Sequence, residues 1–112
     1  MLGARDLTVS TSTAASAQAA TNGDPSSIEV AELYAPFSHQ QLILTEAIGL
    51  NGSTKINPSG GALAANPMFS TGLERIGFAA RHIFEGNASR VLAHATSGPA
   101  LQQNLVAVLE GK

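Results

Sequence analysis

A chain of 112 residues is large enough for one domain with a single modest hydrophobic core. Hydrophobic residues make up 44% of it, as in ordinary globular proteins, but charged residues make up only 12%, against about 25% in an average domain. We therefore expect part of its surface to be covered by another domain or subunit.

The charge and the residue content exclude several classes of function. The net charge is −2 and the six basic residues are scattered, so the sequence has no cluster of positive charge of the kind that binds nucleic acids. The chain contains no cysteine, which excludes a disulfide framework, a thiolate zinc site and a cysteine nucleophile within it. No apolar stretch approaches the roughly 20 residues that span a bilayer, and the first residues do not resemble a signal peptide. We expect a cytoplasmic protein that binds neither membranes nor a metal.

The first third of the chain alternates strand and helix signals. Leu7–Ser10 predicts a short strand, and the alanine-rich run Ala14–Ala20 predicts a helix. The hydroxyl groups between them are interpreted as helix caps, with a ligand cleft at the end of the strand as the alternative. Ile28–Tyr34 predicts a second strand. The helix Ser38–Ile48 follows; a Ser38–Gln41 capping box opens it, and it is apolar around much of its circumference.

The stretch Lys55–Gly72 connects a very short predicted strand at residues 55–57 to the most regular helical pattern of the chain. That pattern begins at a Thr71–Glu74 capping box and is ended by Gly86. Within the stretch lies the pair Gly60-Gly61, a sequence typical of a closely packed backbone.

Two strands complete the chain, Arg90–Ala95 and Asn104–Leu109. The predicted order is therefore β-α-β-α-β-α-β-β, an α/β domain with a five-stranded mixed sheet and helices on its faces. Because a short loop joins the last two strands, we expect them to be antiparallel.

Three stretches of the sequence resemble the C-terminal half of the thiolase superfamily. They are VAELYAPF (Val30–Phe37), INPSGGALAANP (Ile56–Pro67) followed by STGLERI, and VLAHATSGPALQQNLVAVLE (Val91–Glu110). The resemblance extends from about Leu7 to Leu109. It is closest to the lipid-transfer-type thiolases and the actinobacterial acetyl-CoA acetyltransferase-like proteins. It implies that residues 1–112 form one thiolase-like half-domain.

In that family two similar halves pack together, and the N-terminal half supplies a nucleophilic cysteine that carries an acyl group from coenzyme A. This chain has neither that half nor a cysteine. The resemblance therefore implies a thiolase-like N-terminal half or partner subunit, or a homo-oligomer, as its partner. It implies acyl-CoA as substrate, and no permanently bound cofactor.

Three positions match catalytic motifs of the family, and the motif is altered at each. Tyr34 occupies the place of an Asn or His that holds a catalytic water or oxyanion. Asn66 occupies the place of the His that activates the nucleophile; it can donate a hydrogen bond to an oxyanion but cannot act as a base. The third motif, Cys-x-Gly, has lost its cysteine here, although His94 in that region lies where the lipid-transfer branch has a His. The alternatives are a core-edge residue for Tyr34, a turn-former for Asn66 and a packed strand residue for His94.

The remaining candidates are implied by the same motifs. Phe37, the glycine pair Gly60 and Gly61, and the pair Ser97 and Gly98 are expected to bind substrate. The other two histidines, His39 and His82, are interpreted as solvent-facing residues on helices.

Three functions are compatible with these alterations. In the first, which the resemblance implies, the chain would be the C-terminal domain of a thiolase-like acyltransferase of lipid, fatty-acid or steroid metabolism, with altered carbon–carbon chemistry such as retro-aldol cleavage and no activity in isolation. Alternatively, it is a non-catalytic thiolase-fold subunit that stabilises a partner, or an inactive folded fragment.

Overall fold

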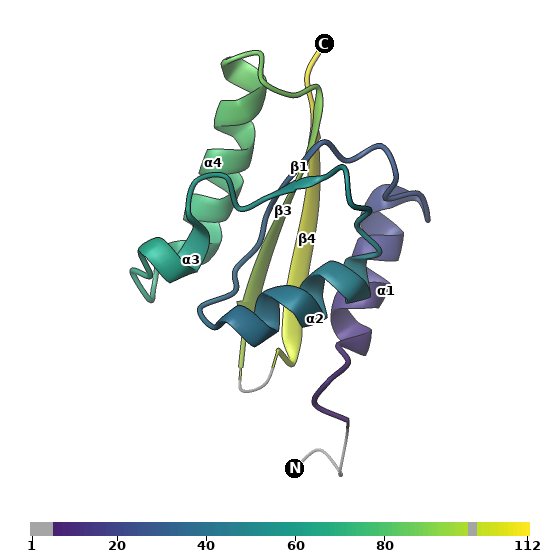
Figure 1. Ribbon diagram of the computed structural model, residues 1–112, viewed down its shortest axis with the longest axis vertical. Coiled ribbons are helices and arrows are strands. Elements are labelled where there is room, and N and C mark those ends of the chain that lie inside the picture. The colour runs from purple at the N-terminus through teal and green to yellow at the C-terminus, as the bar shows by residue number, and fades with distance from the viewer. Residues whose placement is uncertain (1–5, 99–100) are drawn as a thin grey trace.

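The computed structural model describes residues 6–98 and 101–112, which form an α/β fold in three layers (Figure 1). In chain order the elements are α1 (Thr11–Thr21), β1 (Val30–Glu32), α2 (Ser38–Ile48), β2 (Lys55–Ile56), α3 (Gly61–Ala64), α4 (Thr71–Phe84), β3 (Arg90–Ser97) and β4 (Gln103–Glu110). The sheet has the strand order β2-β1-β3-β4. Helices α1 and α2 cover one face, and α4 covers the other. No helix among the described residues is long and apolar enough to cross a membrane.

The sheet is mixed. Strand β1 runs parallel to both β2 and β3, whereas β3 and β4 form an antiparallel pair over their whole length. The predicted α/β class and the antiparallel closing pair are therefore confirmed. Because β1, β2 and β3 are parallel, their carboxyl ends meet at one edge of the sheet, where ligands of open α/β sheets usually bind.

The sheet has four strands in the described residues, not the predicted five. The strand predicted at Leu7–Ser10 is wrong, because these residues form a turn and an extended lead into α1. The Asp6 carboxylate accepts hydrogen bonds from the backbone N–H and the hydroxyl of Thr8, at 2.8 and 2.6 Å. Such a side-chain turn competes with strand pairing. The strand predicted at Ile28–Tyr34 is confirmed only for its centre, Val30–Glu32.

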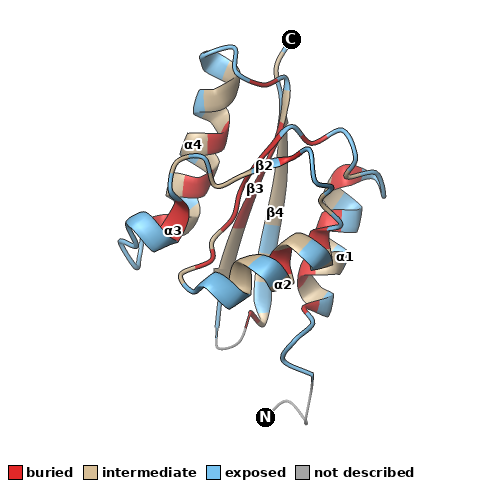
Figure 2. Ribbon diagram, in the orientation of Figure 1, coloured by how far each residue is buried: buried red, intermediate tan, exposed pale blue. Residues whose placement is uncertain are grey.

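The core has two parts, one on each face of the sheet, because successive strand residues point to opposite faces. On one face Leu92 packs with Leu44 and Ile48 of α2. On the other face Val91 packs with Ala79 of α4. Figure 2 shows the buried residues concentrated in the central strands and on the inner sides of the helices.

The bounds predicted for α2 are confirmed, but its capping box is wrong. Ser38 is already the first helical residue, and no side chain caps the helix. The Gln41 side chain accepts instead a hydrogen bond of 2.9 Å from the Asn57 amide. The capping box predicted at Thr71 is wrong for a similar reason: Ser70 precedes the helix, and the Thr71 hydroxyl lies 2.9 Å from the Pro67 carbonyl.

Candidate functional site

A cavity of about 370 Å³ lies at the carboxyl ends of β1 and β3. Its lining comes from the segment after β1, the start of α2, the loop before α4, the end of β3 and the β3–β4 loop: Tyr34, Pro36, Gln40, Met68, Phe69, Thr96, Ser97, Gly98 and Leu101. The size suits a small ligand or part of a larger one. Three of the predicted site residues, Tyr34, Ser97 and Gly98, therefore line one cavity.

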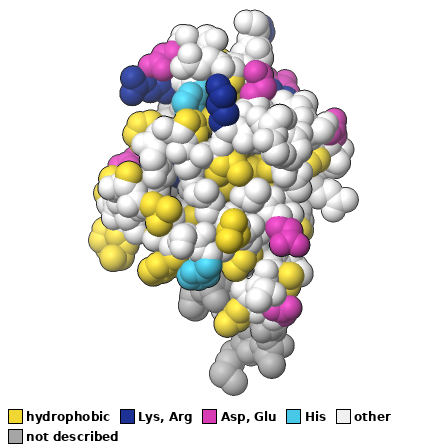
Figure 3. Space-filling model, viewed as in Figure 1, with side chains coloured by type: hydrophobic (Ala, Val, Ile, Leu, Met, Phe, Trp, Pro, Cys, Tyr) yellow, Lys and Arg dark blue, Asp and Glu magenta, His cyan; other side chains and the backbone are white. Residues whose placement is uncertain are grey.

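The cavity is apolar on the side of the α3–α4 loop and hydroxyl-bearing on the side of the sheet. Met68 and Phe69 are both exposed, although they are large and apolar. Figure 3 shows hydrophobic side chains gathered on this lower part of the molecule, around the α3–α4 loop and the start of α2. Sequence reasoning missed Met68 and Phe69. The sequence feature that could have indicated them is a pair of large apolar residues directly after Pro67, in an otherwise polar loop.

The glycine pair adopts left-handed backbone conformations, with φ of 92° at Gly60 and 60° at Gly61. A Cβ added to Gly60 would lie 2.8 Å from the Ala64 side chain, and one added to Gly61 would lie 2.9 Å from Asn57. The close backbone packing predicted for the pair is therefore confirmed. Neither glycine lines the cavity at the carboxyl ends of the strands.

Replacing Gly61 with alanine is expected to destabilise the fold by about 1–3 kcal/mol, because the new Cβ meets both an unfavourable φ and the Asn57 side chain. Gly77→Ala is the matched control. Gly77 is an exposed helical residue with no atom within 4 Å of an added Cβ, so alanine should stabilise the chain by up to about 1 kcal/mol. Urea unfolding of both variants measures the two effects. Equal effects in the two variants would contradict the strain at Gly61.

Two other predicted site residues lie apart from the cavity lining. Asn66 is exposed, and its side-chain oxygen lies 2.9 Å from the Thr71 hydroxyl at the start of α4. Phe37 is exposed and stacks on His39, with 5.9 Å between the ring centroids. In this structure Asn66 helps to form the turn into α4, and His39 faces solvent as predicted.

His94 is fully buried in β3 on the α1 and α2 side of the sheet. Its Nε2 lies 2.8 Å from the side-chain oxygen of Asn104, whose amide in turn donates to the Ser12 hydroxyl at 2.6 Å. Burial lowers the pKa of His94 to about 4, against the opposing effect of the Asn104 hydrogen bond. The histidine is therefore neutral near pH 7, and its contacts are those of a packed strand residue.

A buried polar cluster that the sequence did not suggest lies where β1 ends. Glu32 is fully buried, and its carboxylate accepts a hydrogen bond of 2.6 Å from the Ser59 hydroxyl. The buried Arg75 guanidinium lies 3.5 Å from the same carboxylate, and His82 Nε2 lies 3.3 Å from it. The prediction that His82 faces solvent is therefore wrong. The sequence contained a feature that could have predicted this cluster: Glu32 interrupts an otherwise apolar strand, and a buried carboxylate needs a cationic partner.

This cluster fixes the glycine loop to the sheet. Glu32 also accepts a hydrogen bond from the Ser59 backbone N–H, one residue before the glycine pair. Asn57 makes the second attachment. Its side-chain oxygen accepts a hydrogen bond of 2.6 Å from the Leu33 N–H, and its amide donates to Gln41. The contacts of Glu32 and of Asn57 join residues far apart in the chain, so a local sequence pattern cannot predict them.

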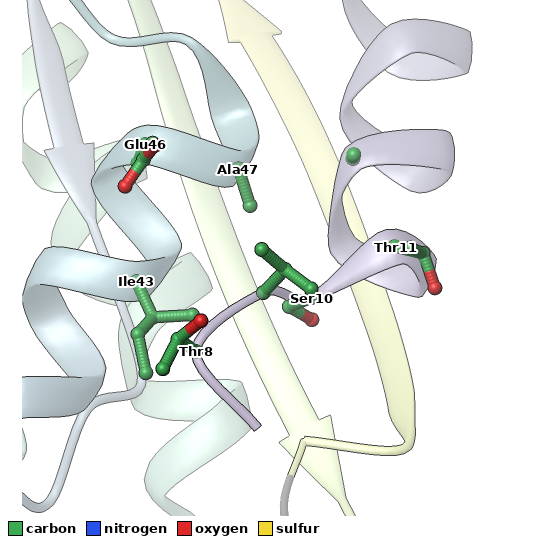
Figure 4. Close-up of a pocket in the computed structure, with 8 residues that line it drawn as sticks. Thr8, Ser10, Thr11, Ile43, Glu46 and Ala47 are labelled. Carbon is green, nitrogen blue, oxygen red and sulfur yellow. The ribbon is translucent and has the colours of Figure 1, made fainter. Parts of the chain in front are cut away.

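A second cavity, of about 260 Å³, lies between the segment before α1 and helix α2. Figure 4 shows Ile43 and Ala47 of α2 facing the segment that carries Thr8 and Ser10. No side chain caps α1, so the capping interpretation of the hydroxyl groups before it is wrong; Ser10 and Thr11 of that group line this cavity instead. Among residues 6–98 and 101–112, no group of three potential metal ligands lies together.

Comparison of the chain with protein-family models, with curated proteins and with solved structures found no match. The resemblance to thiolases therefore stays a prediction based on the three sequence stretches.

Proposed function

We propose that the chain is the C-terminal half-domain of a thiolase-like acyl-CoA acyltransferase of lipid, fatty-acid or steroid metabolism, with altered catalytic motifs. The observation that carries this proposal is the cavity at the carboxyl ends of β1 and β3. It brings Tyr34 together with Ser97 and Gly98, which belong to two separate stretches of the thiolase resemblance.

The chemistry of the lining supports an acyl thioester as the ligand. Met68, Phe69 and Leu101 offer apolar surface to an acyl chain. The hydroxyls of Tyr34 and Ser97 make no hydrogen bond to a described residue and can donate to a thioester carbonyl.

The chain does not carry a complete set of catalytic groups. It has no cysteine, so the nucleophile would come from a thiolase-like N-terminal half or another subunit. His94 is neutral and buried, and Asn66 lies outside the cavity lining. The proposed activity, in the cytoplasm and without a permanently bound cofactor, therefore belongs to a complex, and the isolated chain would be inactive.

Ser97→Trp is expected to weaken the binding of octanoyl-CoA by at least about 10-fold, because the indole would fill the cavity. Ser89→Trp is the matched control, since Ser89 is also an exposed serine but precedes the opposite end of β3. Titration calorimetry with octanoyl-CoA, and with coenzyme A alone, measures the affinities. If the unmodified chain does not bind octanoyl-CoA, or if both variants bind equally, the proposed ligand is wrong.

The second candidate is a non-catalytic subunit that stabilises a partner. The observation that favours it is the structural use of two motif positions: Asn66 contacts Thr71, and His94 is buried against Asn104. Absence of octanoyl-CoA binding in the calorimetry would favour this candidate over the first.

A further inference from the structure

The outward side of α2 carries a stripe of four residues, His39, Leu42, Ile43 and Glu46. Their spacing places them on one side of the helix, opposite the buried Leu44 and Ile48. Leu42 is 73% exposed, His39 and Glu46 are exposed, and Ile43 is half-buried. The stripe therefore has an apolar centre, formed by Leu42 and the half-buried Ile43, with one histidine and one carboxylate at its ends.

The helical layer around this stripe is nearly free of charge. Helices α1 and α2 together contain one Asp, Glu, Lys or Arg residue, which is Glu46, and one histidine, which is His39. Helix α4 on the other face carries Glu74, Arg75 and Arg81. Beside Ile43 the apolar surface continues into the cavity that Figure 4 shows. An apolar surface with so few charges is typical of a surface that another molecule covers.

We propose that this stripe is the interface between two copies of the chain, with their α2 helices antiparallel about a two-fold axis. The axis would pass between Leu42 and Ile43, since His39 and Glu46 lie at equal distances along the helix from that point. His39 of each copy would then lie opposite Glu46 of the other, and Leu42 of each copy would lie opposite Ile43 of the other, beside the axis.

The distribution of charge on the stripe favours antiparallel over parallel packing of the two α2 helices. Antiparallel helices form the contact between His39 and Glu46 twice, whereas parallel helices in register would place the two Glu46 carboxylates side by side. An imidazole N–H can donate to a carboxylate whether or not the ring carries a second proton. Leu42 would supply affinity through burial, and the polar ends would fix the orientation. This proposal does not depend on the acyl ligand.

Leu42→Glu is expected to raise the dissociation constant of the dimer by at least about 10-fold, because it places two carboxylates at the centre of the interface. Leu73→Glu is the matched control: Leu73 is also 73% exposed and helical, but it lies on α4, on the other face of the sheet. Sedimentation of the full chain from micromolar to millimolar concentration measures the constant, and circular dichroism confirms that each variant is folded.

Charge exchange tests the orientation. Glu46→Lys is expected to weaken the dimer, and adding His39→Asp in the same chain is expected to restore it. A monomer at every concentration would overturn the proposal. So would a dimer that Leu73→Glu dissociates and Leu42→Glu does not, or one that the charge exchange leaves unchanged.

Discussion

Arg75→Met is expected to reduce the free energy of unfolding by about 3–5 kcal/mol, because it leaves the buried Glu32 carboxylate without its guanidinium partner. The two side chains are almost completely buried, so water cannot replace the lost contact. The Arg75 guanidinium also lies 3.3 Å from the Ser59 hydroxyl, and the substitution removes that contact with the glycine loop.

Arg81→Met is the matched control for this prediction. Arg81 lies on the same helix and also contacts a glutamate, but its side chain is 66% exposed, so its loss should cost no more than about 1 kcal/mol. The double variant Glu32→Gln/Arg75→Met should be less destabilised than the sum of its single variants, since it leaves no unpaired buried charge. Urea unfolding measures all four. A loss below 1 kcal/mol for Arg75→Met would show that His82 and Ser59 compensate the carboxylate.

The cluster around Glu32 explains why the loop before α4 has a defined shape. The loop contains few large side chains that could bury apolar surface, and much of it is exposed. The start of the loop is fixed instead by polar contacts ahead of the glycine pair: Ser59 donates hydrogen bonds to Glu32, and the Asn57 side chain accepts one from the Leu33 N–H. The polar cluster therefore attaches the loop to the carboxyl end of β1, where apolar burial does not.

Elements whose signals are local could be predicted from the sequence. Helix α2 was predicted with its observed bounds because Pro36 precedes it, Gly49 ends it and apolar residues fill the window. Strands β3 and β4 followed from β-branched and apolar runs separated by a loop. Leu7–Ser10 has the same kind of composition, yet the Asp6 side chain forms a turn there, and composition alone does not separate these outcomes.

The candidate site could be predicted only in part. Tyr34 and Ser97 were named as candidates through the resemblance alone, with no statement of how they lie to each other, and the structure places both in the lining of one cavity. The buried pair of Glu32 and Arg75 joins residues 43 positions apart, and such pairing depends on how the helix packs. The same holds for His94 of β3, whose partner Asn104 lies on β4 and contacts Ser12 of α1, 92 positions away in the chain.

Lowering the pH from 6.5 to 4 is expected to reduce the stability of the chain by about 3 kcal/mol through His94 alone. His94 has a pKa of about 4 in the fold, against 6.5 for an ordinary histidine. A proton on its Nδ1 would be a buried charge with no acceptor among the described residues. Between the two values the unfolded chain therefore binds a proton that the folded chain does not. The stabilisation is complete above pH 6.5 and is lost as the pH falls towards 4.

His94→Gln removes this titration and keeps an N–H group that can donate to Asn104. The variant is expected to be less stable than the unmodified chain at pH 7.5, yet to lose less stability between pH 6.5 and 4. Urea unfolding at several pH values measures the slopes. Parallel stability curves for the unmodified chain and His94→Gln would mean that His94 becomes protonated within the fold, and that its burial is relieved by water entering beside β3.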